Sequence, residues 1–250
     1  MIRFIRFLPI AIFVAMLGGC AGFATQAYTP SQSDPIKEVL ITIPAEFPKV
    51  RIGVAGNAGL MFGAVGGLAA GAFAQTEGER LDQMLNSQGG GYQKQLVSQL
   101  ESFLAAKGIR TQTLAVARGS SRTGLVEDYK SLTLPKNADA ILDIFVWEAG
   151  YGGTHPILDP ENRPIIRLRA QLVSAKTFQV FYADDIFFGF TNPFMQAKEI
   201  KSPKQYYFPT VQALHEDKTR AVEGLQVAAT EVARFLVNEI TMPPNKTVSR

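Results

Sequence analysis

The segment Ala138-Asp-Ala-Ile-Leu-Asp-Ile-Phe-Val-Trp147 decides the fold, because it has the composition of a central β-strand. Alternate positions of a strand point to opposite sides of its sheet, and both sides of this segment are apolar. One side carries Ala140, Leu142, Ile144 and Val146, and the other carries Ile141, Phe145 and Trp147. A strand of this kind is typical of a sheet that is covered on both faces. We therefore expect residues 138–147 to form a central strand buried on both faces.

A β-hairpin is expected to follow this strand. Residues 163–174 alternate in polarity. Leu168, Ala170 and Leu172 are expected to face inward, and Arg167, Arg169 and Gln171 to face outward. Ala175-Lys-Thr177 has the composition of a turn, and residues 178–186 then return as the second strand of the hairpin.

Further elements are expected around these three strands. Strand composition recurs at residues 38–43, 50–55 and 109–116. Apolar stripes predict amphipathic helices at residues 92–104 and 216–240. The stripes are Tyr92, Leu96, Leu100, Phe103 and Leu104 in the first helix, and Ala221, Leu225, Ala228, Val232 and Phe235 in the second. The order predicts an α/β (α+β) fold, a mixed sheet with helices packed on it, in a single domain over residues 39–240 with a tail at 241–250.

The stretch from Leu168 to Tyr182, Leu-Arg-Ala-Gln-Leu-Val-Ser-Ala-Lys-Thr-Phe-Gln-Val-Phe-Tyr, resembles a segment of known periplasmic lipoprotein domains. These families include the curli secretion channel subunit and the activator lipoproteins of penicillin-binding proteins. In them a similar strand turns into the next at a Lys-Thr or Asp-Thr pair, and the element order over residues 48–240 is similar as well. The resemblance implies a periplasmic lipoprotein domain and carries no residue-level site.

The N-terminus has the pattern of an export signal. Arg3 and Arg6 precede an apolar run over residues 7–17, which is too short to span a bilayer comfortably. The run ends in Leu17-Gly-Gly-Cys20, which resembles the lipobox of bacterial lipoproteins, cut by signal peptidase II. The resemblance implies that residues 1–19 are removed, that Cys20 carries a diacylglycerol on sulfur, and that its new amino group is acylated, for example with palmitate. The alternative is a plain signal peptide with an incidental cysteine.

The residue after the lipidated cysteine bears on sorting in bacterial lipoproteins, and here it is Ala21 rather than aspartate. The resemblance therefore implies the inner leaflet of the outer membrane, with the domain facing the periplasm. Residues 20–38 are rich in polar residues and proline, and we expect them to form a lipidated flexible tether.

Composition excludes some classes of function. Removal of residues 1–19 leaves 231 of the 250 residues, with 23 Lys and Arg against 22 Asp and Glu, a formal net charge of +1. A nearly neutral domain has no electrostatic reason to bind nucleic acid. Cys20 is the only cysteine, so no intramolecular disulfide can form.

A glycine-rich segment covers residues 52–74 and contains no charged residue. Within it Gly59, Gly63, Gly67 and Gly71 recur at every fourth position, and on a helix they would form one stripe that another helix can approach closely. The spacing resembles the glycine zippers of membrane-associated and oligomerising bacterial proteins. Three alternatives remain open: a membrane-inserted or spanning segment, a helix packed on the sheet, and a Gly/Ala-rich loop.

Residues suited to catalysis are few. His155 lies in a loop, where it is expected to be exposed, and His215 lies beside two acidic residues at the expected start of the last helix. Asp184 and Asp185 are adjacent, so in a strand they point to opposite sides, and an exposed strand end is expected. The chain has no nucleophile–base motif, no metal-ligand spacing and no phosphate-binding loop. We expect no enzyme activity and no cofactor besides the covalent lipid at Cys20.

Two surface features remain. A modest basic face is formed by Arg118, Arg122, Arg167 and Arg169, and we expect it to be simply solvated. An aromatic-rich stretch contains Phe187, Phe188, Phe190, Phe194, Tyr206, Tyr207 and Phe208. Aromatic residues dominate binding hot spots, so these residues are candidates for partner contact, and the alternative is that they close the core.

The sequence thus favours a non-enzymatic outer-membrane lipoprotein that binds a protein partner or acts as an assembly factor of the cell envelope. One alternative is a self-oligomerising pore or secretion component that uses the glycine stripe. An envelope hydrolase using Asp184 or His155 is the least favoured hypothesis.

Overall fold

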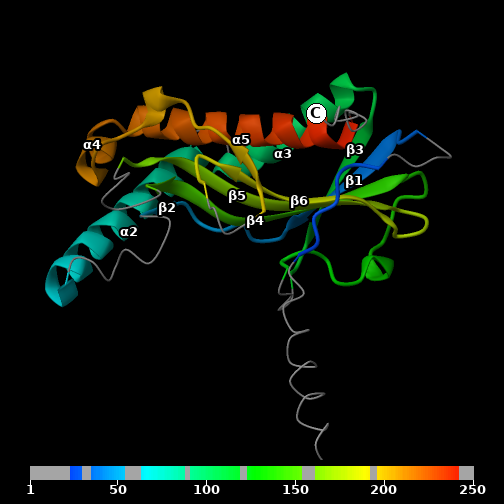
Figure 1. Ribbon diagram of the computed structural model, residues 1–250, viewed down its shortest axis with the longest axis horizontal. Coiled ribbons are helices and arrows are strands. Elements are labelled where there is room, and N and C mark those ends of the chain that lie inside the picture. The colour runs from blue at the N-terminus through cyan, green and yellow to red at the C-terminus, as the bar shows by residue number, and fades with distance from the viewer. Residues whose placement is uncertain are drawn as a thin grey trace, which may run out of the picture.

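The computed structural model describes residues 23–29, 35–53, 63–87, 91–118, 123–153, 161–191 and 196–241. Within them a seven-stranded mixed sheet carries packed helices, so the expected α/β fold is confirmed (Figure 1). The strands are β1 (Glu38–Pro44), β2 (Arg51–Ile52), β3 (Arg110–Val116), β4 (Ala140–Gly152), β5 (Arg163–Ser174), β6 (Val180–Phe188) and β7 (Lys198–Ile200). The helices are α2 (Gly63–Ser87), α3 (Gly91–Ala106), α4 (Val211–Glu216) and α5 (Lys218–Thr241), with 3₁₀ turns η2 (Tyr129–Ser131) and η3 (Lys204–Tyr206).

The sheet has the strand order β3-β1-β4-β5-β6-β7, and β2 also pairs with β4. β1 is parallel to both β3 and β4, whereas β4, β5 and β6 form consecutive antiparallel pairs. The central position of the strand that begins near residue 138 and the hairpin that follows it are confirmed. β4 extends to Gly152, beyond its expected end at Trp147.

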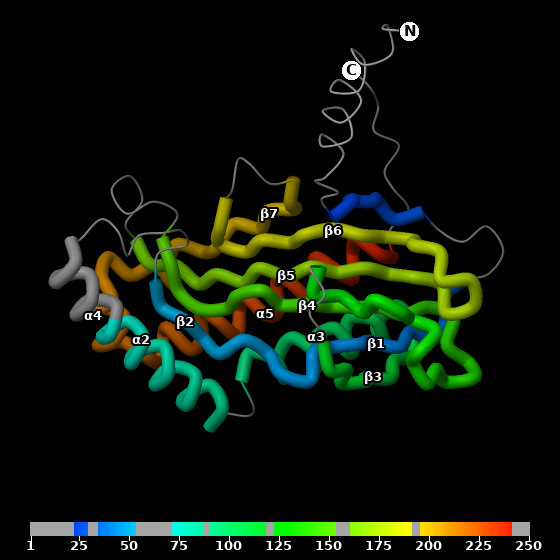
Figure 2. The backbone as a smooth tube through the Cα atoms, turned by 90° about the horizontal axis from the view of Figure 1, so that it is seen from below, coloured from blue at the N-terminus to red at the C-terminus, as the bar shows by residue number. Residues whose placement is uncertain are grey.

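Two helices, α3 and α5, lie side by side along one face of the sheet (Figures 1 and 2). The expected stripes are buried there in Tyr92, Leu96, Leu100, Leu104, Ala221, Leu225, Ala228 and Val232, whereas Phe103 and Phe235 are only partly buried. Burial of a leucine side chain contributes about 1.5–3 kcal/mol, so this layer is the main apolar core of the domain.

The opposite face of the sheet points away from α3 and α5, and we call it the loop-side face. It is defined by Asp143, Phe145 and Trp147 of β4, Arg169 of β5 and Asp185 of β6, which alternate with the residues buried under the helices. The pairing register shifts between Val146 and Glu148, and Trp147 in this irregularity is 40% exposed. The expectation that residues 138–147 are buried on both faces is therefore wrong at Trp147, because the register shift places its side chain at the surface.

The segment 23–29 adds to the edge of the sheet. Gln26 exchanges two backbone hydrogen bonds with Ala183 of β6, at 2.7 and 2.9 Å, and the amide of Thr29 donates to the carbonyl of Phe181 at 2.8 Å. Figure 2 shows this segment, in blue, beside β6. The expected flexible tether is therefore wrong for residues 23–29, because their backbone satisfies the open edge of β6.

The glycine-rich segment is helical from Gly63 onward, which excludes the loop hypothesis for Gly63, Gly67 and Gly71, while Gly59 lies outside the described residues. The same helix continues to Ser87. Its close approach to another element occurs at Gly78, where an added Cβ would lie 3.0 Å from the carbonyl oxygen of Val50. Across the described part of the chain, helices long and apolar enough to cross a membrane are absent.

The bounds of one short strand and of the last helix differ slightly from those that the sequence predicts. The expected strand at residues 50–55 is described only as Arg51–Ile52. The expected helix at residues 216–240 corresponds to α5, which begins at Lys218, and the separate short helix α4 precedes it. His215 therefore lies in the last turn of α4 rather than at the start of the long helix.

Candidate functional site

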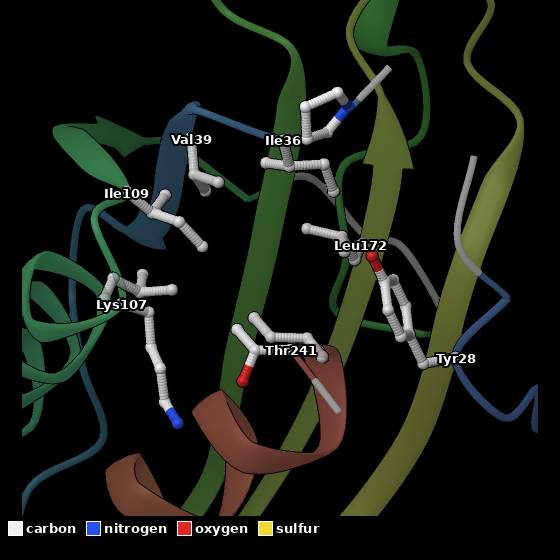
Figure 3. Close-up of a pocket in the computed structure, with 10 residues that line it drawn as sticks. Tyr28, Ile36, Val39, Lys107, Ile109, Leu172 and Thr241 are labelled. Carbon is white, nitrogen blue, oxygen red and sulfur yellow. The ribbon is translucent and has the colours of Figure 1, made fainter. Parts of the chain in front are cut away.

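An apolar pocket of about 410 Å³ opens at the end of the domain where α3 and α5 end. Its lining comes from five parts of the chain, with Tyr28 of the N-terminal segment, Ile36 and Val39 around the start of β1, Leu104 on α3, Leu172 on β5 and Ile240 on α5. Figure 3 shows these elements around the space, with the Tyr28 hydroxyl directed toward Leu172. A pocket of this volume, with mostly apolar walls and few polar groups, is typical of a binding site.

The end of α3 positions one rim of the pocket. Gly108 has φ 76°, a conformation that ends a helix, and the amide of Ile109 donates to the carbonyl of Leu104 at 3.0 Å. This turn places Lys107 and Ile109 beside the opening. The opposite rim is supplied by Tyr28, which follows Gln26 on the edge of β6.

Among the described residues that line the pocket, Tyr28, Lys107 and Thr241 have polar side chains. Burial raises the pKa of the Tyr28 hydroxyl, so this group stays protonated and can donate a hydrogen bond. The hydroxyl of Thr241 donates to the carbonyl of Val237 at 2.7 Å. Of these three residues, Lys107 is the charged one, and it is exposed. The pocket therefore suits an apolar group that carries an acidic or hydrogen-bond-accepting end.

Most of the aromatic residues proposed for partner contact lie in the protein interior. Phe187, Phe188, Phe190, Tyr206 and Phe208 are buried, Tyr207 is half-buried and donates a hydrogen bond to the carbonyl of Ser202 at 3.1 Å, and Phe194 lies outside the described residues. The interpretation as an exposed contact surface is wrong for the five buried residues, because their rings pack inside the domain. Phe208, for example, packs edge-on against Tyr151, with ring centroids 5.5 Å apart.

The basic face is not a solvated surface either. The side chain of Arg118 is buried and forms an ion pair with Asp143 at 2.6 Å, and Arg169 is buried beside Asp185. Arg167 lies 3.3 Å from Glu148 and over the rings of Phe187 and Phe190. Arg122 lies outside the described residues. The alternation of polar and apolar residues along the chain predicted that these arginines are exposed. It could not show that acidic residues of neighbouring strands pair with them.

Asp143 is a buried polar residue that the sequence did not single out. Its carboxylate accepts hydrogen bonds from the hydroxyls of Thr42 and Tyr129 at 2.7 and 2.9 Å, and from the amide of Val126 at 2.7 Å. Arg118 supplies the balancing charge. Since every partner stabilises the charged carboxylate, this network joins the loop after β3 to the centre of the sheet.

Asp184 and Asp185 are both buried, so the expected exposed strand end is wrong. They do point to opposite sides of β6, as expected. Asp185 pairs with Arg169 on the loop-side face, and burial raises the pKa of Asp184 to about 6. Separated in this way, they do not form an acid–base pair.

His215 contacts Glu77 of α2, with 2.5 Å between Nδ1 and Oε2. Glu77 is buried and also contacts Arg80 and Lys218, so it joins α2 to α4 and α5. Among the described residues, groups of three or more histidine, cysteine or acidic residues able to hold a metal are absent. Cys20 and His155 lie outside the described residues.

Comparison with known proteins gives only distant likenesses. Neither a protein-family model nor a curated protein matches the chain. Among solved structures, a DUF330-family protein from Xanthomonas campestris has 15% identity and a TM-score of 0.34, covering 86% of this chain and 93% of its own. A neuraminyllactose-binding hemagglutinin homologue from Helicobacter pylori has 11% identity and a TM-score of 0.33, covering 87% and 91%. A protein from Chlamydia trachomatis has 10% identity and a TM-score of 0.29, covering 82% and 98%.

Proposed function

We propose that this chain is an outer-membrane lipoprotein whose periplasmic domain is a non-enzymatic binding or assembly factor of the cell envelope. The observation that carries the proposal is the attachment of residues 23–29 to the edge of β6. These residues follow Cys20 of the lipobox-like sequence closely, and they also supply Tyr28 to the wall of the pocket. Lipidation at Cys20 would therefore hold a folded domain and its pocket next to the membrane.

The pocket is the proposed binding site, in place of the buried aromatic residues. Its apolar walls fit the side chains of a short apolar segment of an envelope protein. An acidic group of that segment would lie near Lys107, a charged residue at the rim of the pocket. Burial of an apolar side chain in such a pocket contributes about 1.5–3 kcal/mol toward binding.

A photoreactive amino acid at position 107 tests this proposal in living cells. The matched control is position 136, because Lys136 is also exposed and lies outside the pocket lining. We expect a discrete adduct with one envelope protein from position 107 and none from position 136. With that protein purified, Lys107→Glu should weaken binding about tenfold, or about 1.4 kcal/mol, and Lys136→Glu should not.

Three outcomes would contradict the proposal. Equal adducts from positions 107 and 136 would show that the pocket is not the contact surface. Unchanged affinity of the Lys107→Glu variant for the purified partner would show the same. An adduct with phospholipid alone would assign the pocket to a lipid and not to a protein.

The self-assembling alternative retains one supporting observation, since α2 carries Gly63, Gly67 and Gly71 in one continuous helix. Leucine at positions 63 and 67 would block close helix contact along this stripe. The measurement is the mass of the acylated protein in mild detergent, with the wild type beside Gly63→Leu/Gly67→Leu. A discrete oligomer that is lost in the variant would favour a pore or scaffold over a partner-binding monomer.

A further inference from the structure

We propose that the loop-side face of the sheet, around Trp147 and Arg169, lies against the bilayer that holds the lipid anchor. This inference rests on the lipidation of Cys20 proposed above, and it adds the orientation of the domain. The helices α3 and α5 then face the periplasm.

The start of the described chain lies on this face. The ring centroid of Phe23 is 4.0 Å from the guanidinium carbon of Arg169. The segment then follows the edge of β6, where the side-chain amide of Gln26 donates to the carbonyl of Val180 at 2.8 Å in addition to its backbone pairing with Ala183. Backbone and side-chain contacts therefore both fix the position of Phe23.

The length of chain between Cys20 and Phe23 limits where the membrane can be. Three residues span at most about 10 Å when fully extended. A single helix layer with its side chains is about 10–12 Å thick, and the sheet lies beyond it. A lipid on Cys20 could not reach a bilayer on the α3 and α5 side from Phe23. Of the two faces of the sheet, it is therefore the loop-side face that can lie against the bilayer.

The side chains of this face suit a membrane interface. Trp147 is 40% exposed, and its ring lies 4.9 Å from that of Phe145 and 4.8 Å from the Arg169 guanidinium carbon. Tryptophan is enriched where a bilayer meets water, because its ring is apolar and its N–H can form a hydrogen bond. Arg169 is paired with Asp185, so its charge is already balanced. The contact therefore does not depend on anionic lipid.

The chain has a single tryptophan, so its fluorescence reports on this one position. The experiment reconstitutes the acylated full chain into phosphatidylcholine vesicles whose acyl chains are brominated near the headgroup. We expect quenching that removes about half of the Trp147 emission, because an interfacial ring lies within reach of the bromines. Added salt at about 1 M should leave the quenching unchanged, since screening weakens interactions between exposed charges and the proposed contact of Trp147 is not one of them.

The matched control moves the probe to the helix side of the domain. Phe103 lies on α3, where Arg234 of α5 covers it at 5.4 Å, so Phe103→Trp/Trp147→Phe places the only tryptophan in the helix layer. Its emission should be unquenched in the same vesicles. Equal quenching of both probes, or no quenching of Trp147 in a vesicle-bound acylated chain, would overturn the orientation and leave the lipoprotein proposal standing. A chain that carries no lipid on Cys20 would overturn both.

Discussion

Arg169 on β5 and Asp185 on β6 form a bidentate ion pair across the loop-side face. Nε of Arg169 lies 2.7 Å from Oδ1 of Asp185, and Nη2 lies 2.8 Å from Oδ2. The two residues are direct cross-strand neighbours, and their side chains are only 9% and 7% exposed. Trp147 and Phe23 pack against the same guanidinium, so one buried cation connects the centre of the sheet to the start of the described chain.

Removal of one partner of this pair should be costly. Asp185→Asn leaves the buried guanidinium without its counter-charge, and we expect a loss of about 3–5 kcal/mol in the free energy of unfolding. Urea unfolding measures it. The control is Glu231→Gln, which breaks the exposed pair with Arg234 and should cost less than about 1 kcal/mol. The double variant Arg169→Met/Asp185→Leu should recover most of the loss, and a double variant as unstable as Asp185→Asn would contradict this explanation.

Glu77 should make the stability of the domain dependent on acidic pH. Burial alone would raise the pKa of Glu77, but hydrogen bonds with His215 and Arg80 and the charge of Lys218 outweigh it and lower the pKa below 4.5. A carboxyl group whose pKa is lowered by folding stabilises the folded state above its unfolded pKa, and this contribution is lost as the pH falls through the folded value. Glu77→Gln should therefore be clearly less stable than wild type at pH 7 and approach it below pH 4 in urea titrations. An equal difference in the free energy of unfolding between Glu77→Gln and wild type at both pH values would contradict a lowered pKa for Glu77.

Asp184 should destabilise the folded domain at neutral and alkaline pH, whereas Glu77 stabilises it there. Burial raises its pKa to about 6, so the charged carboxylate is unfavourable in the folded state at neutral pH. The amide of Asp185 donates to Oδ1 of Asp184 at 2.9 Å, and asparagine can keep this hydrogen bond. We expect Asp184→Asn to stabilise the domain by about 1–2 kcal/mol at pH 8 and to have no effect at pH 4. Thermal or urea unfolding at the two pH values measures it, and destabilisation at pH 8 would refute the assignment.

Gly224 should be intolerant of a side chain although it lies in the middle of α5. An added Cβ would lie 2.2 Å from the Tyr151 hydroxyl, which donates to the carbonyl of Ala221 at 3.0 Å. In an exposed helix, replacement of glycine by alanine gains about 1 kcal/mol. Here we expect Gly224→Ala to lose about 2–3 kcal/mol, because the tyrosine must move. Gly53→Ala is the control, since an added Cβ there has no neighbour within 4 Å, and a stabilised Gly224→Ala would contradict the described packing.

The local pattern of apolar residues was sufficient to predict the central strand, the hairpin after it and the apolar stripes of α3 and α5. Each depends on a period of 2 or 3.6 residues, which the sequence shows directly. The same pattern wrongly predicted that Arg169 is exposed. Alternation shows on which side of the sheet a residue lies, but it does not show what covers that side. Only the fold brings Asp185 and Phe23 to Arg169.

The candidate site was harder to predict, because its parts are distant in sequence. Tyr28, Lys107 and Thr241 meet only when the ends of α3 and α5 come together with the edge of β6. The contact of Glu77 with His215 joins residues 138 positions apart. The aromatic residues from Phe187 to Phe208 were ambiguous, since an aromatic ring serves the core and an interface equally well.

Lipidation of Cys20 is the central proposal for this protein, and the intact mass of the protein extracted from membranes tests it directly. We expect a chain that begins at Cys20, with a diacylglycerol on the sulfur and an acyl group on the amine. In the same experiment Cys20→Ser should carry no lipid and should leave the outer-membrane fraction. A wild-type chain with an unmodified Cys20 thiol, or one that begins at another residue, would contradict the proposed lipidation.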